Sequence, residues 1–164
     1  SHYILVGTRL PPMNLHEQTV LGKRLLTDYY ARALMVRAGL ISPAEFAAQW
    51  NEMLAAYARS RARTMPGERA RGAFWEDQTA QALPYQRGAM LAAMWNARLL
   101  VASKGVANLD TVLKAQLTAA QSSTQWATIL FRNFAGRHGL DISADEERYL
   151  VRGETIMCIS RDSI

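Results

Sequence analysis

The chain has 164 residues, 49% of them apolar, and a formal net charge of +5 at pH 7. This length suits a single globular domain whose own core is large enough to stabilise it, so folding requires no disulfide or metal. The one cysteine, Cys158, excludes an intrachain disulfide and a cysteine-based zinc cluster.

Apolar residues recur at helical spacing along most of the chain, which predicts an all-α fold. We expect one domain over residues 1–164, an irregular bundle of about six to seven helices. Residues 1–12 are the exception, because an apolar run that ends in two prolines favours an extended segment. A long helix is predicted over residues 15–38, with Gly39 just past its end.

The stretch SPAEF gives the clearest helix start. Ser42 is predicted to be the N-cap, Pro43 occupies the first helical position and Glu45 completes a capping box. One face of the following helix carries large apolar side chains, which predicts that it packs into the core. These residues are Phe46, Trp50, Met53, Leu54 and Tyr57.

Residues 60–71 read as a loop, and residues 73–80 as a short helix before a break at Pro84. The next helix, residues 85–103, is apolar on several sides and should be surrounded by its neighbours. Its large apolar residues are Met90, Leu91, Met94, Trp95, Leu99 and Leu100.

Three shorter helices are predicted in the last third of the chain, over residues 109–120, 124–135 and 144–151. Asn108 is the expected cap of the first, and Gly136 the expected stop of the second. The tail TIMCIS favours a short strand that could pair with the N-terminal segment.

Arginines concentrate in the stretch ARSRARTMPGERARG. A nucleic-acid interface would place aromatic side chains among them for base stacking, and none lies between Arg59 and Arg71. A solvated loop is therefore the favoured interpretation. A phosphate-binding surface and an acidic protein partner are the alternatives.

The sequence contains no apolar run of about 18 residues that would predict a membrane span, and it contains no signal-peptide pattern. We expect a soluble protein without a membrane partner, in the cytoplasm or the periplasm.

Motifs for phosphate, dinucleotide and nucleophilic serine sites are absent from the sequence. His16 and Glu17 begin like an HExxH zinc helix, but Val20 occupies the position of the second ligand. Without two imidazoles on one helical face, this segment lacks half of the usual zinc ligands. His138 is expected at a helix C-terminus, where the helix dipole favours a cation.

Two stretches resemble a known family. RLLTDYYARALMVRAGLISPAEF follows, without a gap, the pattern W-x-x-E-G-x-T-x-Y-Y that continues into L-L-x-R-A-G-L-I-S-x-x-E-[YF]. LPYQRGAMLA resembles the Y-x-K-G-A segment at Tyr85, Gly88 and Ala89, with Arg87 in place of lysine. Both patterns are typical of the glycyl aminopeptidase-like zinc metallopeptidases, bacterial hydrolases among the gluzincins related to aminopeptidase N. The positions that match in the first stretch are Thr27, Tyr29, Tyr30, Arg37, Ala38, Gly39, Leu40, Ile41, Ser42, Glu45 and Phe46.

The resemblance implies the helical part of a metallopeptidase catalytic domain. In that family an HExxH helix supplies two histidine ligands and a general base, and a later glutamate supplies the third ligand. The zinc ion lowers the pKa of its bound water. Tyr85 matches the tyrosine that hydrogen-bonds the developing oxyanion, so Tyr85 is the catalytic candidate that the resemblance indicates.

The metal site looks degenerate in this sequence. The register of the resemblance places Arg24 where the ligand glutamate belongs, and a guanidinium offers a metal no lone pair. GTRLPP is similar to the family's G-K-R-L-R-P, which puts Tyr3, or His2 after a shift of one residue, at the second histidine. The chain is then either a fragment whose missing part lies upstream or a branch that has lost its metal, and Arg24 favours the second explanation.

Three functions remain open from the sequence. The first is the helical part of an aminopeptidase-like metallopeptidase, non-catalytic and without a cofactor of its own although zinc serves the family. A peptide, or an upstream domain of the same parent chain, would be its partner. The second is a helical protein-interaction module with no peptidase role, and the third, which the sequence supports least, is arginine-mediated binding of nucleic acid. The sequence assigns no substrate-binding residues.

Overall fold

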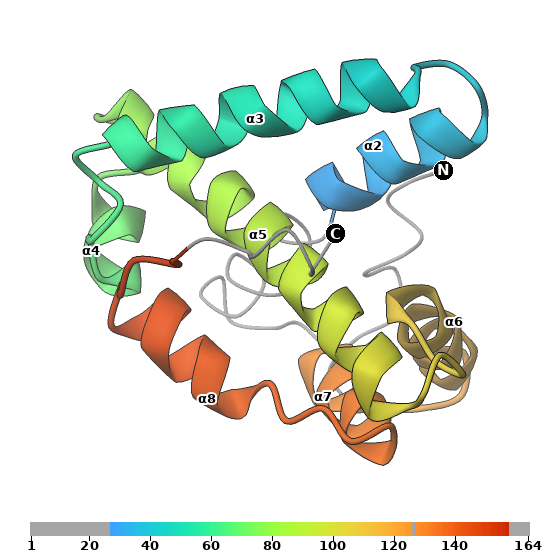
Figure 1. The fold of residues 1–164 in the computed structure, drawn as a ribbon. Coiled ribbons are helices and arrows are strands. Elements are labelled where there is room, and N and C mark those ends of the chain that lie inside the picture. Colours follow the sequence, from blue (N-terminus) through green and yellow to red (C-terminus); the bar gives the residue numbers. More distant parts are fainter. Residues whose placement is uncertain (1–26, 126, 158–164) are drawn as a thin grey trace.

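The structure, a computed structural model, describes residues 27–125 and 127–157, and the side chains of 29–125 and 128–157. The described residues form seven α-helices, labelled α2 to α8 as in Figure 1, and one π-helix, η3. None of them forms a strand, and the predicted all-α irregular bundle is confirmed. The predicted segment 1–12, the start of the helix over 15–38 and the end of the predicted C-terminal strand lie outside the described residues.

The first two described helices are α2 (Thr27–Arg37) and α3 (Pro43–Arg59). The turn between them uses Gly39 at φ +69°, and Leu40 donates its backbone N–H to the Met35 carbonyl. This is a Schellman ending, in which glycine adopts the left-handed backbone without a Cβ penalty. The predicted capping box at Ser42 is confirmed, because its hydroxyl accepts from the Glu45 N–H and its own N–H donates to the Glu45 carboxylate.

Helix α5 (Gln78–Ala102) runs through the middle of the molecule in Figure 1, with α3 crossing one end and α6 and α7 near the other. It packs against α2, α3, α4 and α6. This agrees with the prediction of a helix surrounded by its neighbours, except near its C-terminal end, where Leu100 is exposed. The fully buried large side chains of α5 are Leu83, Leu91, Trp95 and Leu99.

The predicted break at Pro84 is wrong, because α5 passes through Pro84 without interruption. Proline removes one backbone hydrogen bond, yet burial of residues on both sides holds the helix together. The predicted helix over residues 73–80 is likewise wrong. Its first half is the turn before α5, and the short helix is instead α4 (Gly67–Gly72), which begins inside the predicted loop and ends one residue beyond it.

The prediction for α6 (Leu109–Ala120) is confirmed, including its Asn108 cap. Helix α7 (Ala127–Arg137) does not stop at Gly136 as predicted. It ends at Arg137, and Gly139, two residues later, has φ +84°, while Leu140 donates its N–H to the Ala135 carbonyl. Only the residue that follows the last helical turn must be left-handed, so Gly136 remains inside the helix.

The last predicted helix begins as α8 (Ser143–Asp145) and continues as η3 (Glu146–Val151), a wider π-helical turn. Residues 153–157 have no regular structure, so the predicted strand does not form over its described part. The Ile156 N–H donates to the Tyr57 hydroxyl, which ties this tail to α3. None of the described helices is long and apolar enough to span a membrane.

Candidate functional site

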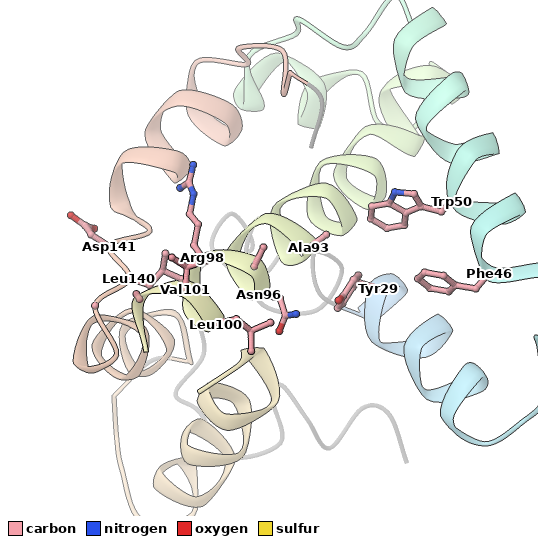
Figure 2. Close-up of a pocket in the computed structure, with 13 residues that line it drawn as sticks. Tyr29, Phe46, Trp50, Ala93, Asn96, Arg98, Leu100, Val101, Leu140 and Asp141 are labelled. Carbon is pink, nitrogen blue, oxygen red and sulfur yellow. The ribbon is translucent and has the colours of Figure 1, made fainter. Parts of the chain in front are cut away.

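A pocket of about 690 Å³ lies along one side of α5 (Figure 2). Helices α2 and α3 close one end of it, and the turn that follows α7 closes the other. The described residues that line it are Tyr29, Phe46, Trp50, Ala93, Asn96, Ala97, Arg98, Leu100, Val101, Ala102, Gly139, Leu140 and Asp141.

Three aromatic rings form the wall at the α2–α3 end (Figure 2). Phe46 and Trp50 are one turn apart on α3 and stack with their ring centroids 6.1 Å apart. Tyr29 of α2 meets Trp50 edge to face, at 6.3 Å between centroids. The sequence predicted that Phe46 and Trp50 lie in the core. Trp50 is buried there, whereas Phe46 is only partly buried, and both also line the pocket.

Small side chains of α5 leave room for the pocket. Ala93 and Ala97 are one turn apart and both line it. At the opposite end Leu100 and Val101 are exposed, Val101 by 81%. Most of the lining is therefore apolar, as in sites that bury the apolar part of a ligand.

Asn96 is a polar group among these apolar residues. Its Oδ1 accepts a hydrogen bond from the Leu109 backbone N–H at 3.0 Å, at the start of α6. Because the amide oxygen is engaged there, the NH₂ group of Asn96 faces away from the start of α6. In Figure 2 the amide nitrogen points toward the side of the pocket on which Tyr29 lies.

Tyr29 supplies a second polar group. Partial burial, with a smaller effect of the Asp110 carboxylate, raises the pKa of Tyr29 above its usual value. The phenol therefore keeps its proton and can donate a hydrogen bond at neutral pH. No other described residue hydrogen-bonds this hydroxyl.

Arg98 and Asp141 lie at the rim. Arg98 donates from Nη1 to Asp145 Oδ2 at 2.6 Å, and Trp95 Nε1 donates to the same oxygen at 2.9 Å. Asp145 is 5% exposed, so its charge is paired in a buried position. Asp141 accepts from the Ser143 N–H at 2.9 Å, which holds the pKa of Asp141 below its usual value.

A second polar cluster fixes α2, which carries Tyr29. Tyr30 donates to Asp110 Oδ1 and Arg37 donates to Asp110 Oδ2, both at 2.6 Å. Partial burial alone would raise the pKa of Asp110, but these two bonds hold it below the usual range. Asp110 therefore stays ionised and links α2 to the start of α6 at neutral pH.

Tyr85, the catalytic candidate, lies inside α5 and is partly buried. It does not line the pocket. The pocket begins at Ala93, two turns further along the helix, which is about 12 Å at about 1.5 Å per residue. The structure therefore does not bring Tyr85 together with the pocket residues.

Arg87, which replaces the lysine of the family pattern, is 3% exposed. Its Nη2 donates to the carbonyls of Arg63 at 3.0 Å and Met65 at 2.7 Å. No described carboxylate pairs with it, and desolvation lowers the pKa of its guanidinium. These contacts make Arg87 a structural residue that holds the segment before α4 against α5.

The described residues do not fit a zinc ion. No group of three or more histidine, cysteine, aspartate or glutamate side chains among them could hold a metal. Arg24, which the resemblance places at the ligand position, lies outside the described residues, as do His2 and Tyr3.

The arginine-rich segment is largely exposed. Arg61, with a 77% exposed side chain, pairs with Asp77 at 3.1 Å, and Arg63 donates to the Ala58 carbonyl. Hydrogen bonds from Thr79, with a smaller contribution from Arg61, lower the pKa of Asp77 to about 2. Beside this segment stands Trp75, which is 83% exposed.

Sequence reasoning missed Asn96 and Arg98 as pocket residues. The available signal was the polar pair in the stretch AAMWNARLL, inside a helix expected to be buried on several sides. Its significance depends on α6, because the Leu109 N–H is what orients the amide.

Compared with known proteins, the chain matches no family model and no curated protein sequence. The resemblance to glycyl aminopeptidase-like peptidases therefore stays a prediction.

Proposed function

We propose that this chain is a non-catalytic helical domain, related to the helical part of aminopeptidase-like metallopeptidases, that binds peptides. The observation that carries the proposal is the pocket beside α5, with an aromatic wall at one end and hydrogen-bond donors within it. A peptide offers the matching chemistry, an apolar side chain next to backbone carbonyl oxygens.

The electrostatics of the lining support an uncharged ligand segment. Arg98 and Asp145 offset each other, and Asp141 adds a negative charge at the rim, so the lining offers no net positive charge to a ligand carboxylate. Tyr29 and Asn96 are neutral at pH 7. An apolar pocket with a few placed polar groups is the usual form of a small-ligand site.

The absence of catalysis is proposed from Arg24 and from the donor set of the described residues. A cationic side chain cannot replace an anionic zinc ligand, and no three-ligand group is present among the described residues. Titration with zinc in a calorimeter, together with an aminopeptidase assay on unblocked dipeptide amides, tests this part. Stoichiometric tight zinc binding with hydrolysis would refute it.

Peptide binding is tested with short peptides that are acetylated and amidated and carry phenylalanine, leucine or serine in the central position. We expect binding of the phenylalanine and leucine peptides, measured by calorimetry, and much weaker binding of the serine peptide. Phe46→Ala removes part of the aromatic wall and should weaken binding at least about fivefold through lost apolar contact. Equal affinity for all three peptides would contradict the proposal.

A protein-interaction module is the second candidate, and Trp75 favours it. Tryptophan and arginine are among the residues most enriched at energetic centres of protein interfaces, and Trp75, four residues after Arg71, is 83% exposed. Glu76 and Asp77 follow it directly, so the local charge is mixed and fits a protein better than a polyanion. A photo-crosslinking residue at position 75, compared with one at exposed Asn51, tests whether this surface meets a partner in cells.

A further inference from the structure

We propose that Asn96 selects a ligand that presents a hydrogen-bond acceptor. Its side-chain amide donates a hydrogen bond to a backbone carbonyl oxygen of the bound peptide. The inference rests on the proposed peptide binding and goes beyond it, because it assigns the polar contact and its direction.

The orientation of the amide follows from α6. The first N–H groups of a helix have no partner within the helix. Asn108 accepts from the Thr111 N–H at 3.0 Å, and Asn96 Oδ1 accepts from the Leu109 N–H at the same distance. Rotating the Asn96 amide by half a turn would place two N–H groups against each other and leave the Leu109 donor unpaired. The NH₂ group is therefore held away from α6.

The surroundings of this NH₂ group call for an acceptor. Tyr29, on the side of the pocket toward which the nitrogen points, is itself a protonated donor. Among the described residues, no acceptor is hydrogen-bonded to the Asn96 nitrogen. Two neutral donors next to an aromatic wall fit a carbonyl oxygen beside an apolar side chain.

The rim disfavours a ligand carboxylate. The charge of Arg98 is offset by Asp145, which it contacts at 2.6 Å, and Asp141 adds a negative charge. A peptide held by an internal carbonyl should consequently bind equally well with an amidated or a free C-terminus. A free carboxylate as the bound group would instead make the unblocked peptide bind more tightly.

Asn96→Asp is the decisive variant, because it keeps the oxygen that accepts from α6 and removes the NH₂ donor. One carboxylate oxygen still accepts from the Leu109 N–H, while the other replaces the donor with a negatively charged acceptor. We expect the affinity for the phenylalanine peptide to fall about tenfold or more. Asn51→Asp adds the same charge on the exposed side of α3, outside the pocket lining, and should leave the affinity unchanged.

The outcomes distinguish the inference from the function on which it rests. Wild-type protein that binds none of the peptides overturns both. Wild-type protein that binds, with Asn96→Asp binding equally, overturns the role of Asn96 and leaves peptide binding standing. Tighter binding of the free acid than of the amide also overturns the inference, since the bound group would be a carboxylate.

A measurement on the wild-type chain covers the case in which Asn96→Asp fails to fold. The side-chain amide signals of Asn96 in a ¹H–¹⁵N correlation spectrum should move downfield when the peptide is added, because a new hydrogen bond deshields the donor proton. Amide signals that stay in place while the peptide saturates the pocket would overturn the proposal.

Discussion

Gly153 stands where a side chain has no room. Its φ is +75°, and an added Cβ atom would lie 2.3 Å from the Met65 carbonyl oxygen. A Cβ atom added to Gly67 would likewise lie 2.1 Å from the Leu150 carbonyl oxygen. These two glycines let the ends of α4 and η3 approach each other backbone to backbone.

Gly153→Ala should destabilise the fold by at least about 3 kcal/mol, since a left-handed backbone and a steric collision add together. Gly105→Ala is the matched control, because Gly105 has φ +84° with no atom within 4 Å of an added Cβ. The control should lose only about 1 kcal/mol. Urea unfolding of both variants measures the difference, and equal losses would show that the close approach contributes nothing.

Glu146 is 6% exposed and uses only one of its oxygens. Oε2 accepts from Arg132 at 2.6 Å, while Oε1 has no hydrogen-bond partner among the described residues. Burial raises the pKa of Glu146, and the Arg132 contact only partly opposes this. A raised folded pKa means that the folded state holds the proton more tightly than the unfolded state does. This group therefore lowers stability as pH rises from about 4.3 through the folded pKa.

Glu146→Gln should remove this pH dependence. Thermal unfolding of the wild-type chain and the variant between pH 4 and pH 7 tests it, with the variant gaining stability relative to the wild type as the pH rises. A difference that stays constant over that range would contradict the raised pKa.

At the scale of elements, α5 shows how packing overrides local preference. Pro84 lies in the interior of α5, a helix of 25 residues in all. The proline ring leaves the Ala80 carbonyl without its usual donor. The buried residues around it, among them Leu83 and Ala89, compensate for that loss through their packing.

Pro84→Ala should therefore stabilise the chain, by about 1 to 2 kcal/mol, because alanine restores the hydrogen bond to Ala80. The gain is smaller than the full proline penalty, since proline also restricts the unfolded chain. Chemical denaturation measures it, and helical circular dichroism should stay unchanged. Destabilisation would show that the ring itself packs favourably.

At the scale of the whole molecule, Arg87 joins segments that are distant in the sequence. It lies on α5 and donates to two carbonyls before α4. Tyr57 of α3 accepts the Ile156 N–H from the C-terminal tail. The partial negative charge on the Tyr57 oxygen, which can accept a hydrogen bond from the Arg87 guanidinium, favours the charged form of Arg87 and opposes the lowering of its pKa by burial. The two side chains together connect α3, α5 and the tail.

Arg87→Met should destabilise the chain by about 2 kcal/mol or more, because the Arg63 and Met65 carbonyls lose their donor. Exposed Arg69→Met is the control and should change stability by less than about 0.5 kcal/mol. Hydrogen exchange at the Ile156 N–H gives a local measurement, and it should accelerate only in Arg87→Met. Unchanged exchange there would mean that the tail is held independently of Arg87.

The sequence by itself determined the features that depend on neighbours along the chain. The caps at Ser42 and Asn108 and the stop at Gly39 are hydrogen bonds within a few residues, so the local sequence suffices. The all-α class follows from the spacing of apolar residues in the same way.

Only the tertiary structure decided the continuity of α5 and the composition of the pocket. Pro84 remains helical because distant helices bury its surroundings, and local propensity cannot include them. Asn96 becomes a fixed donor because the Leu109 N–H occupies its oxygen. The pocket begins two turns beyond Tyr85 because α2, α3 and the turn after α7 form its other walls, and only the tertiary structure places those segments. Such relations arise from contacts between segments far apart in the chain, and these are formed only on folding.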